Sequence, residues 1–167
     1  LSIRRQRQMC IRDRFNSYNE HYILSNMYPC DLIYKGAIFY GVDHLYHFLL
    51  FYRDKEIQDK IMKKCKGINA NFQAKKIAEE NKDKIEDITP MQRYSLLKKC
   101  IRLKAEQCRL FKEKLKSTCG MYLVEFAWWG DTEFGCVLKD GKYTGNNVTG
   151  RLMEEIRGEL VKTPQFA

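Results

Sequence analysis

Residues 43–53, DHLYHFLLFYR, limit how this chain can fold more than any other segment, because their apolar side chains cover nearly every face of a helix. A helix that is apolar all round belongs in a protein interior. The pattern therefore predicts a buried helix with Asp43 near its N-terminus. Two short apolar-aromatic runs, 31–34 and 37–40, precede it and are joined by a Lys-Gly pair. A two-residue loop ending in Gly is typical of a tight β-hairpin.

Further helices follow the buried one. Amphipathic spacing predicts helices over residues 56–66 and 71–81, the second with Phe72, Ile77 and Ala78 facing inward. Thr89-Pro90 is a strong helix start, since the hydroxyl can cap and Pro suits the first helical position. An apolar stripe then continues to a stop near Gly120.

The C-terminal third predicts a strand over 121–126, a Trp- and Gly-rich loop to Gly145, and a helix over about 147–161. These elements together predict an α+β fold, a mainly α-helical single domain with a small β-sheet. At 167 residues the chain has about the length of one domain. We expect that domain over residues 15–162, followed by a tail over 163–167.

Residues 1–14, LSIRRQRQMCIRDR, have no apolar core of a signal peptide and no cleavage site. They resemble the translation of a sequencing adapter. We expect a peripheral, poorly packed extension outside the domain, either native or artefactual.

The net charge of +9 is unevenly distributed, since residues 53–116 hold 19 Lys and Arg against 10 Asp and Glu. Such a balance is compatible with nucleic-acid binding, but interleaved charges are more often a solvated helix face. The seven cysteines form no CxxC pair, which favours reduced thiols over a disulfide framework or a structural zinc. No apolar run approaches the roughly 18–20 residues of a membrane span. We therefore expect a cytoplasmic protein with no membrane partner.

Three stretches carry a more specific signal. The first is LSNMYPC at 24–30, and the second is Asp43-His44 at the start of the buried helix. The third is LVEFAWWGDTEFG at 123–135, followed by GNNVTGRLMEEIR at 145–157. In this order and spacing, over roughly residues 15–160, the chain resembles the YbiA-like family, also called NADAR.

The resemblance implies an N-glycosidase that cleaves the bond between a phosphorylated ribose, or ADP-ribose, and a nitrogen of a base or aminopyrimidine. Family members resemble hydrolases of riboflavin-synthesis intermediates or enzymes that remove ADP-ribose from guanine in DNA. The partner is then a small phosphoribosyl or ADP-ribosyl substrate, or ADP-ribosylated nucleic acid. Hydrolysis of this kind needs no metal and no organic cofactor.

The resemblance also implies a set of site residues. A carboxylate beside the ribose carbon stabilises positive charge and orients water. The implied catalytic residues are Asp43, His44 and Asp131. The implied substrate-binding residues are Asn26, Trp129, Phe134, Asn147, Gly150 and Arg157, with an aromatic face for the base and the start of the last helix for phosphate.

Simpler roles stay open for each of these residues. Asp43 suits an N-cap, Asp131 suits a turn, and Arg157 suits an ordinary helix surface. The family usually has Glu at the position of Asp43 and Lys at that of Leu50. These departures leave open a module that binds ADP-ribose or NAD without catalysis. A basic helical nucleic-acid binder is the third reading.

Overall fold

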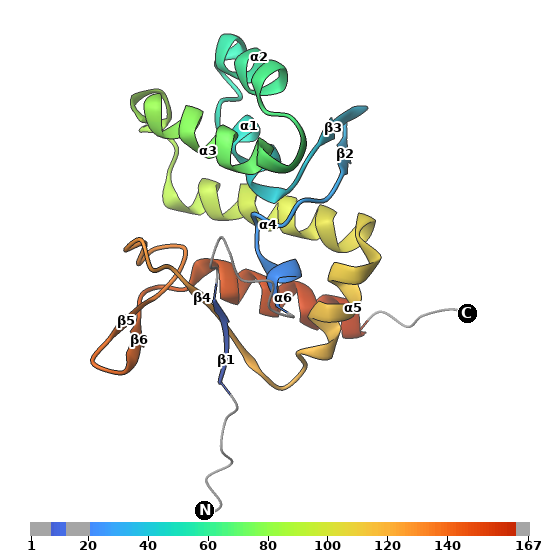
Figure 1. Ribbon diagram of the computed structural model, residues 1–167, viewed down its shortest axis with the longest axis vertical. Coiled ribbons are helices and arrows are strands. Elements are labelled where there is room, and N and C mark those ends of the chain that lie inside the picture. Colours follow the sequence, from blue (N-terminus) through green and yellow to red (C-terminus); the bar gives the residue numbers. More distant parts are fainter. Residues whose placement is uncertain (1–7, 13–20, 163–167) are drawn as a thin grey trace, which may run out of the picture. The chain divides into compact units, whose positions relative to one another are not determined.

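The computed structural model of the chain describes residues 8–12 and 21–162, with the side chains of 21–162 (Figure 1). The fold is α+β and mainly helical, which confirms the expected class. Its strands form three two-stranded sheets in the described residues, rather than one small sheet. The chain divides into two compact units. We call Asn26–Arg109 the helical unit and the remainder, up to Ser25 and from Leu110, the terminal unit.

The helical unit begins with a hairpin of β2 (Leu32–Tyr34) and β3 (Ala37–Phe39), in which Tyr34 pairs with Ala37. Lys35 and Gly36 both have positive φ, as a type I′ turn requires, so the predicted hairpin is confirmed. Four helices follow: α1 (Val42–Leu50), α2 (Lys55–Lys64), α3 (Ala70–Glu80) and α4 (Pro90–Gln107).

Helix α1 forms the centre of the helical unit and contacts α2, α3 and α4. Its side chains Leu45 and Leu50 are buried, as is Phe51 just after it, which confirms the predicted buried helix. Asp54 caps α2, for which the sequence pattern predicts no cap, by accepting the N–H of Ile57 at 3.0 Å. The helix start predicted at Thr89-Pro90 is confirmed. Thr89 and Gln92 form a capping box at α4.

One inward prediction in α3 is wrong. Ile77 and Ala78 are buried, but Phe72 is 55% exposed. The buried positions of this helix are Ala70, Asn71, Ala74, Ile77 and Ala78. The polar Asn71 therefore lies on the buried face of α3, where the sequence pattern predicts the apolar Phe72.

The terminal unit is built on β4 (Tyr122–Phe126), which contacts both β1 (Gln8–Arg12) and α6 (Val148–Lys162). It also contains a hairpin of β5 (Val137–Lys139) and β6 (Lys142–Thr144). Helix α5 (Arg109–Ser117) starts at the boundary of the two units, and a short 3₁₀ turn, η1, spans Tyr22–Leu24.

Two elements of this region differ from their prediction. The long stripe after Thr89 is two helices, because Cys108 has extended backbone angles between α4 and α5. Apolar spacing continues across that residue, so periodicity does not reveal the break. The loop before Gly145 contains the β5–β6 hairpin, whose turn is Asp140-Gly141 with positive φ at both residues. An Asp-Gly pair is a strong hairpin signal.

Part of the N-terminal extension, residues 8–12, is described by the structure as β1. β1 pairs in parallel with β4, in a register from Gln8–Tyr122 to Arg12–Phe126. These backbone pairs make residues 8–12 part of a sheet. The bounds predicted for the extension and the domain stay predictions, and the rest of 1–14 lies outside the described residues.

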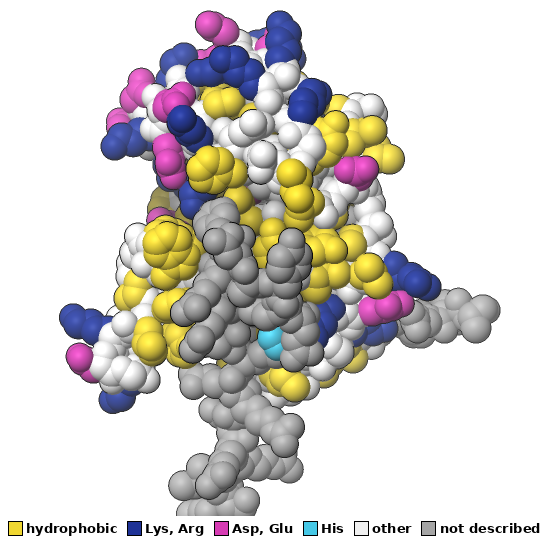
Figure 2. All heavy atoms as spheres, viewed as in Figure 1, with side chains coloured by type: hydrophobic (Ala, Val, Ile, Leu, Met, Phe, Trp, Pro, Cys, Tyr) yellow, Lys and Arg dark blue, Asp and Glu magenta, His cyan; other side chains and the backbone are white. Residues whose placement is uncertain are grey.

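Basic and acidic side chains alternate over α2 and α3, as Figure 2 shows. Lys55 pairs with Asp59 at 3.0 Å, and Lys60 pairs with Glu80 at 3.7 Å. Interleaving of this kind favours a solvated face over a continuous basic patch. None of the helices among the described residues combines the length and apolar character needed to cross a membrane.

Candidate active site

The start of α1 places Asp43 in the first helical turn. The N-cap position is Gly41, so the carboxylate of Asp43 does not serve as the cap. The Asp43 N–H donates to the carbonyl oxygen of Asn26 at 3.3 Å. Two residues of the predicted site, Asn26 and Asp43, are therefore neighbours. The positive end of the helix dipole favours a negative charge at this position.

Asn71 of α3 supplies the cap that Gly41 lacks. Its Oδ1 accepts the N–H of His44 at 2.9 Å, and its Nδ2 donates to the carbonyls of Met27 and Tyr40, both at 3.2 Å. A Cβ at Gly41 would lie only 2.3 Å from the Asn71 amide, so glycine leaves room for this contact. One buried amide thus joins the loop of Met27, the end of the hairpin and the start of α1.

His44 is fully buried beside Asp43. Its Nδ1 accepts the N–H of Tyr40 at 3.1 Å, so the neutral ring carries its proton on Nε2. The ring stacks on Tyr40 with 5.8 Å between centroids and meets the edge of Phe39 at 5.2 Å. Burial, and then the charge of Lys66, lower the pKa of His44 to about 4. The imidazole is therefore neutral at pH 7 and can donate from Nε2.

Two buried side-chain atoms, Oδ1 of Asn26 and Nε2 of His44, have no hydrogen-bond partner among the described residues. Asn26 is 7% exposed. Buried polar atoms are almost always paired, so atoms left unpaired by the protein point to a ligand or water. The negative charge of Asp43 also reaches Cys100 of α4, where it adds to burial in raising the pKa of that thiol. The structure thus brings Asn26, Asp43 and His44 together.

The other predicted residues lie in the terminal unit. Asp131 holds a turn, because its Oδ1 accepts the N–H groups of Glu133 and Phe134, both at 2.9 Å. Phe134 is half-buried, and its carbonyl accepts the N–H of Thr149 at 3.0 Å. Trp129 is 36% exposed, and its ring meets that of Trp128 edge to face at 6.0 Å. The tryptophan pair is the part of this loop that offers an exposed aromatic surface.

Asn147 is a clamp between α6 and β4. Its Nδ2 donates to the carbonyl of Leu123 at 2.7 Å, and its Oδ1 accepts the N–H of Glu125 at 3.0 Å. Gly150 lets the helix approach, because a Cβ there would lie 2.1 Å from the Leu123 carbonyl oxygen. Both residues therefore have structural roles in the terminal unit.

The start of α6 does not offer the free amides expected for a phosphate. The N–H groups of residues 146–149 donate to the carbonyls of Thr132, Gly135, Glu133 and Phe134, at 2.7 to 3.3 Å. Arg157, farther along α6, donates through Nη1 to Thr118 Oγ1 at 2.9 Å and to the carbonyls of Thr118 and Met121 at 2.7 and 3.0 Å. The arginine thus holds the turn before β4.

Asn71 is the residue that sequence reasoning missed. It lies 27 positions after His44 and 44 after Met27, and its partners are mostly backbone atoms, which leave no motif. The signal available was a polar residue on the inner face of the predicted helix over 71–81. Leu50, where the resembled family has Lys, is 4% exposed and belongs to the core.

Comparisons with known proteins show a likeness to a solved structure. No protein-family model and no curated protein matches the sequence. The NMR structure of the Escherichia coli protein YbiA matches with a TM-score of 0.70 and 17% identity, over 96% of this chain and 92% of YbiA. The chain has a YbiA-like fold. At this identity the likeness concerns the fold, and the YbiA-like fold spans both units described above.

Proposed function

We propose that the chain is an N-glycosidase that hydrolyses the bond between a phosphorylated ribose, or ADP-ribose, and a nitrogen of a base or aminopyrimidine. The YbiA-like fold and the motif resemblance support this reaction class. The observation that carries the proposal is the start of α1. There Asp43 is bonded through its backbone N–H to Asn26 and is followed by His44, and the buried atoms Asn26 Oδ1 and His44 Nε2 have no partner among the described residues.

The three groups suit a ribose at its anomeric carbon. Cleavage of the C1′–N bond leaves positive charge on C1′, which the carboxylate of Asp43 stabilises. A water molecule adds its oxygen to C1′, and its proton balances the nitrogen that departs as N–H. A ribose hydroxyl both donates and accepts, so it matches the acceptor Asn26 Oδ1 and the donor His44 Nε2. His44 is a positioning and binding group here, since at pH 7 its ring lacks the second proton of an imidazolium and its Nε2–H serves only as a hydrogen-bond donor.

Two observations favour a second candidate, a module that binds ADP-ribose without turnover. The position where the resembled family has Lys is the buried Leu50, so no cation is available there. The first amides of α6 are already paired within the terminal unit. A shorter acid at position 43 adds to this, because displacement of a reacting group by ~1 Å can cost about 100-fold in rate.

Product release separates the two candidates. The full chain is incubated with an ADP-ribosylated guanine oligonucleotide and with a ribosylaminopyrimidine phosphate, and the freed sugar is followed by mass spectrometry. Asp43→Asn is compared with wild type and with Asp31→Asn, an exposed aspartate in the same unit. Release by wild type and Asp31→Asn, but not by Asp43→Asn, supports the glycosidase. No release, with calorimetric binding of ADP-ribose, supports the module; neither release nor binding overturns both.

A further inference from the structure

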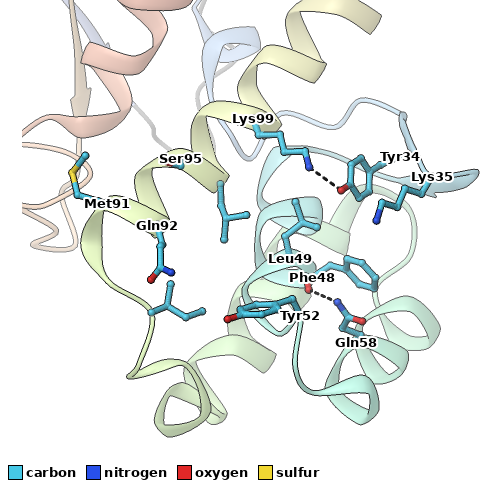
Figure 3. A pocket seen from close by; sticks show the side chains of 12 residues that line it. Tyr34, Lys35, Phe48, Leu49, Tyr52, Gln58, Met91, Gln92, Ser95 and Lys99 are labelled. Atoms are coloured by element: carbon cyan, nitrogen blue, oxygen red, sulfur yellow. Dashed lines mark hydrogen bonds between the residues drawn. The ribbon is translucent and has the colours of Figure 1, made fainter.

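The helical unit contains a pocket of about 870 Å³ that is separate from the residues around Asp43. It lies between the β2–β3 hairpin, α1 and α4 (Figure 3). Neither Asn26, Asp43 nor His44 lines it. Pockets that bind small molecules in proteins typically measure about 300–1,000 Å³.

The walls of this pocket are aromatic and held in place. Tyr34, Phe48 and Tyr52 supply three rings, and Tyr52 is 53% exposed. The Lys99 ammonium donates to the Tyr34 hydroxyl at 2.9 Å and lies 4.7 Å from the centre of that ring. Gln58 donates from Nε2 to the Phe48 carbonyl at 3.1 Å. The Phe48 ring also packs edge to face against Phe39 at 5.0 Å, so the rings of Tyr34 and Phe48 are held before a ligand arrives.

The charged side chains that line the pocket are both positive, namely Lys35 and Lys99. Lys35 and Lys99 lie on either side of Tyr34 (Figure 3), with the Lys35 ammonium 5.7 Å from the ring centre. No Asp or Glu lines the pocket, and neither lysine forms an ion pair with a carboxylate in the described part of the chain. The other polar side chains of α4 that line the pocket are neutral, namely Gln92 and Ser95. Two uncompensated cations beside apolar walls attract an anion.

We propose that this pocket binds a planar aromatic molecule that carries an anionic group. Its ring lies against Phe48 and Tyr52, where stacked or edge-to-face contacts are favourable. Its anion pairs with Lys35 and Lys99 next to Tyr34. The site is independent of the hydrolysis proposed at Asp43 and goes beyond it.

A pair of fluorescent probes tests the proposal: 1-anilinonaphthalene-8-sulfonate, an aromatic anion, and N-phenyl-1-naphthylamine, its neutral counterpart. The double variant Lys35→Gln/Lys99→Met is expected to bind the sulfonate at least about tenfold more weakly, the equivalent of one lost charge contact. The neutral probe is expected to change by less than about threefold. Ser95→Trp, which fills the pocket, is expected to weaken both probes.

Lys63→Gln/Lys64→Met is the matched control, because it removes two exposed charges from α2, outside this pocket. Circular dichroism establishes that each variant is folded. If loss of the Lys99–Tyr34 bond unfolds the double variant, Lys35→Gln alone serves, since the exposed Lys35 has no side-chain hydrogen bond to any described residue. Sulfonate affinity equal in the pocket and control variants, or binding unchanged by Ser95→Trp, overturns the proposal.

Discussion

Asp131 uses its carboxylate to hold its own loop, where Oδ1 accepts two backbone N–H groups. Asp43 has a different setting, because Gly41 occupies the cap position and Asn71 makes the cap bond to His44. The carboxylate of Asp43 lies in the first turn of α1, where the positive end of the helix dipole favours a negative charge. We therefore place the proposed chemistry on Asp43 and give Asp131 a structural role.

The buried histidines predict a stability that depends on pH. Burial lowers the pKa of His44 to about 4 and of His47 to about 3, whereas both rings titrate near 6.5 in the unfolded chain. The unfolded state therefore binds more protons below pH 6.5, so their stabilising contribution is complete above that pH and is lost as pH falls toward 4. From pH 7 to 5.5 we expect the unfolding free energy to fall by about 1 kcal/mol for each histidine.

Urea denaturation at pH 7 and pH 5.5 measures this effect. His47→Leu is expected to show about half of the wild-type decrease, because one of the two titrating rings is gone. A wild-type unfolding free energy that is equal at both pH values contradicts the assignment of neutral, buried imidazoles.

At the scale of elements, the Asn71 side chain bonds α3 to the first turn of α1, to the loop at Met27 and to Tyr40 at the end of the β2–β3 hairpin. Asn71→Ala leaves the N–H of His44 and the carbonyls of Met27 and Tyr40 without their partner. Each buried polar group left unpaired costs about 1–3 kcal/mol, so we expect a loss of several kcal/mol in unfolding free energy. The exposed Asn69, two positions earlier, makes no side-chain cap bond and is the control, so Asn69→Ala is expected to change stability by less than about 0.5 kcal/mol. Equal stability of the two variants in urea would show that Asn71 is not the cap of α1.

Asn147 performs the corresponding task in the terminal unit. Asn147→Ala removes both bonds to β4 and also places Ala at a positive φ of 50°, which Asn tolerates better. We expect a loss of about 2 kcal/mol or more in unfolding free energy, measured by urea denaturation. Asn146→Ala, at the exposed neighbour, is expected to stay within about 0.5 kcal/mol of wild type. Equal effects at the two positions would contradict a clamp.

Some elements of this fold have a local sequence signal and could be predicted, whereas others could not. Thr89-Pro90, the Lys-Gly turn and the apolar run of α1 each act locally, so their elements could be predicted. Apolar spacing continues across Cys108, so the sequence pattern does not reveal the break between α4 and α5. Asp140-Gly141 is the turn signal of the β5–β6 hairpin, although the sequence prediction for this segment is a loop. The side-chain bonds of Asn71 and Asn147 join backbone atoms more than 20 positions away, and no local pattern encodes them.

For the whole molecule, the pairing of β1 with β4 predicts that the first residues contribute to stability. Deletion of residues 1–12 removes the strand that pairs with β4 and leaves the N–H and carbonyl groups of that strand edge unpaired. We expect Tm to fall by at least about 4 °C, since ~1 kcal/mol corresponds to about 2–4 °C in a chain of this size. Differential scanning calorimetry measures the change. A deletion with the Tm of the full chain would contradict a structural role for β1.

Isotope incorporation is the most direct test of the proposed hydrolysis at Asp43. The full chain is incubated in H₂¹⁸O with ADP-ribosylated guanine DNA or a ribosylaminopyrimidine phosphate, and the freed sugar is weighed by mass spectrometry at short times. We predict that wild type and Asp131→Asn release sugar with one ¹⁸O at rates within about threefold, and that Asp43→Asn releases none. Absence of sugar with wild type, sugar without ¹⁸O, or equal release by Asp43→Asn would contradict the account.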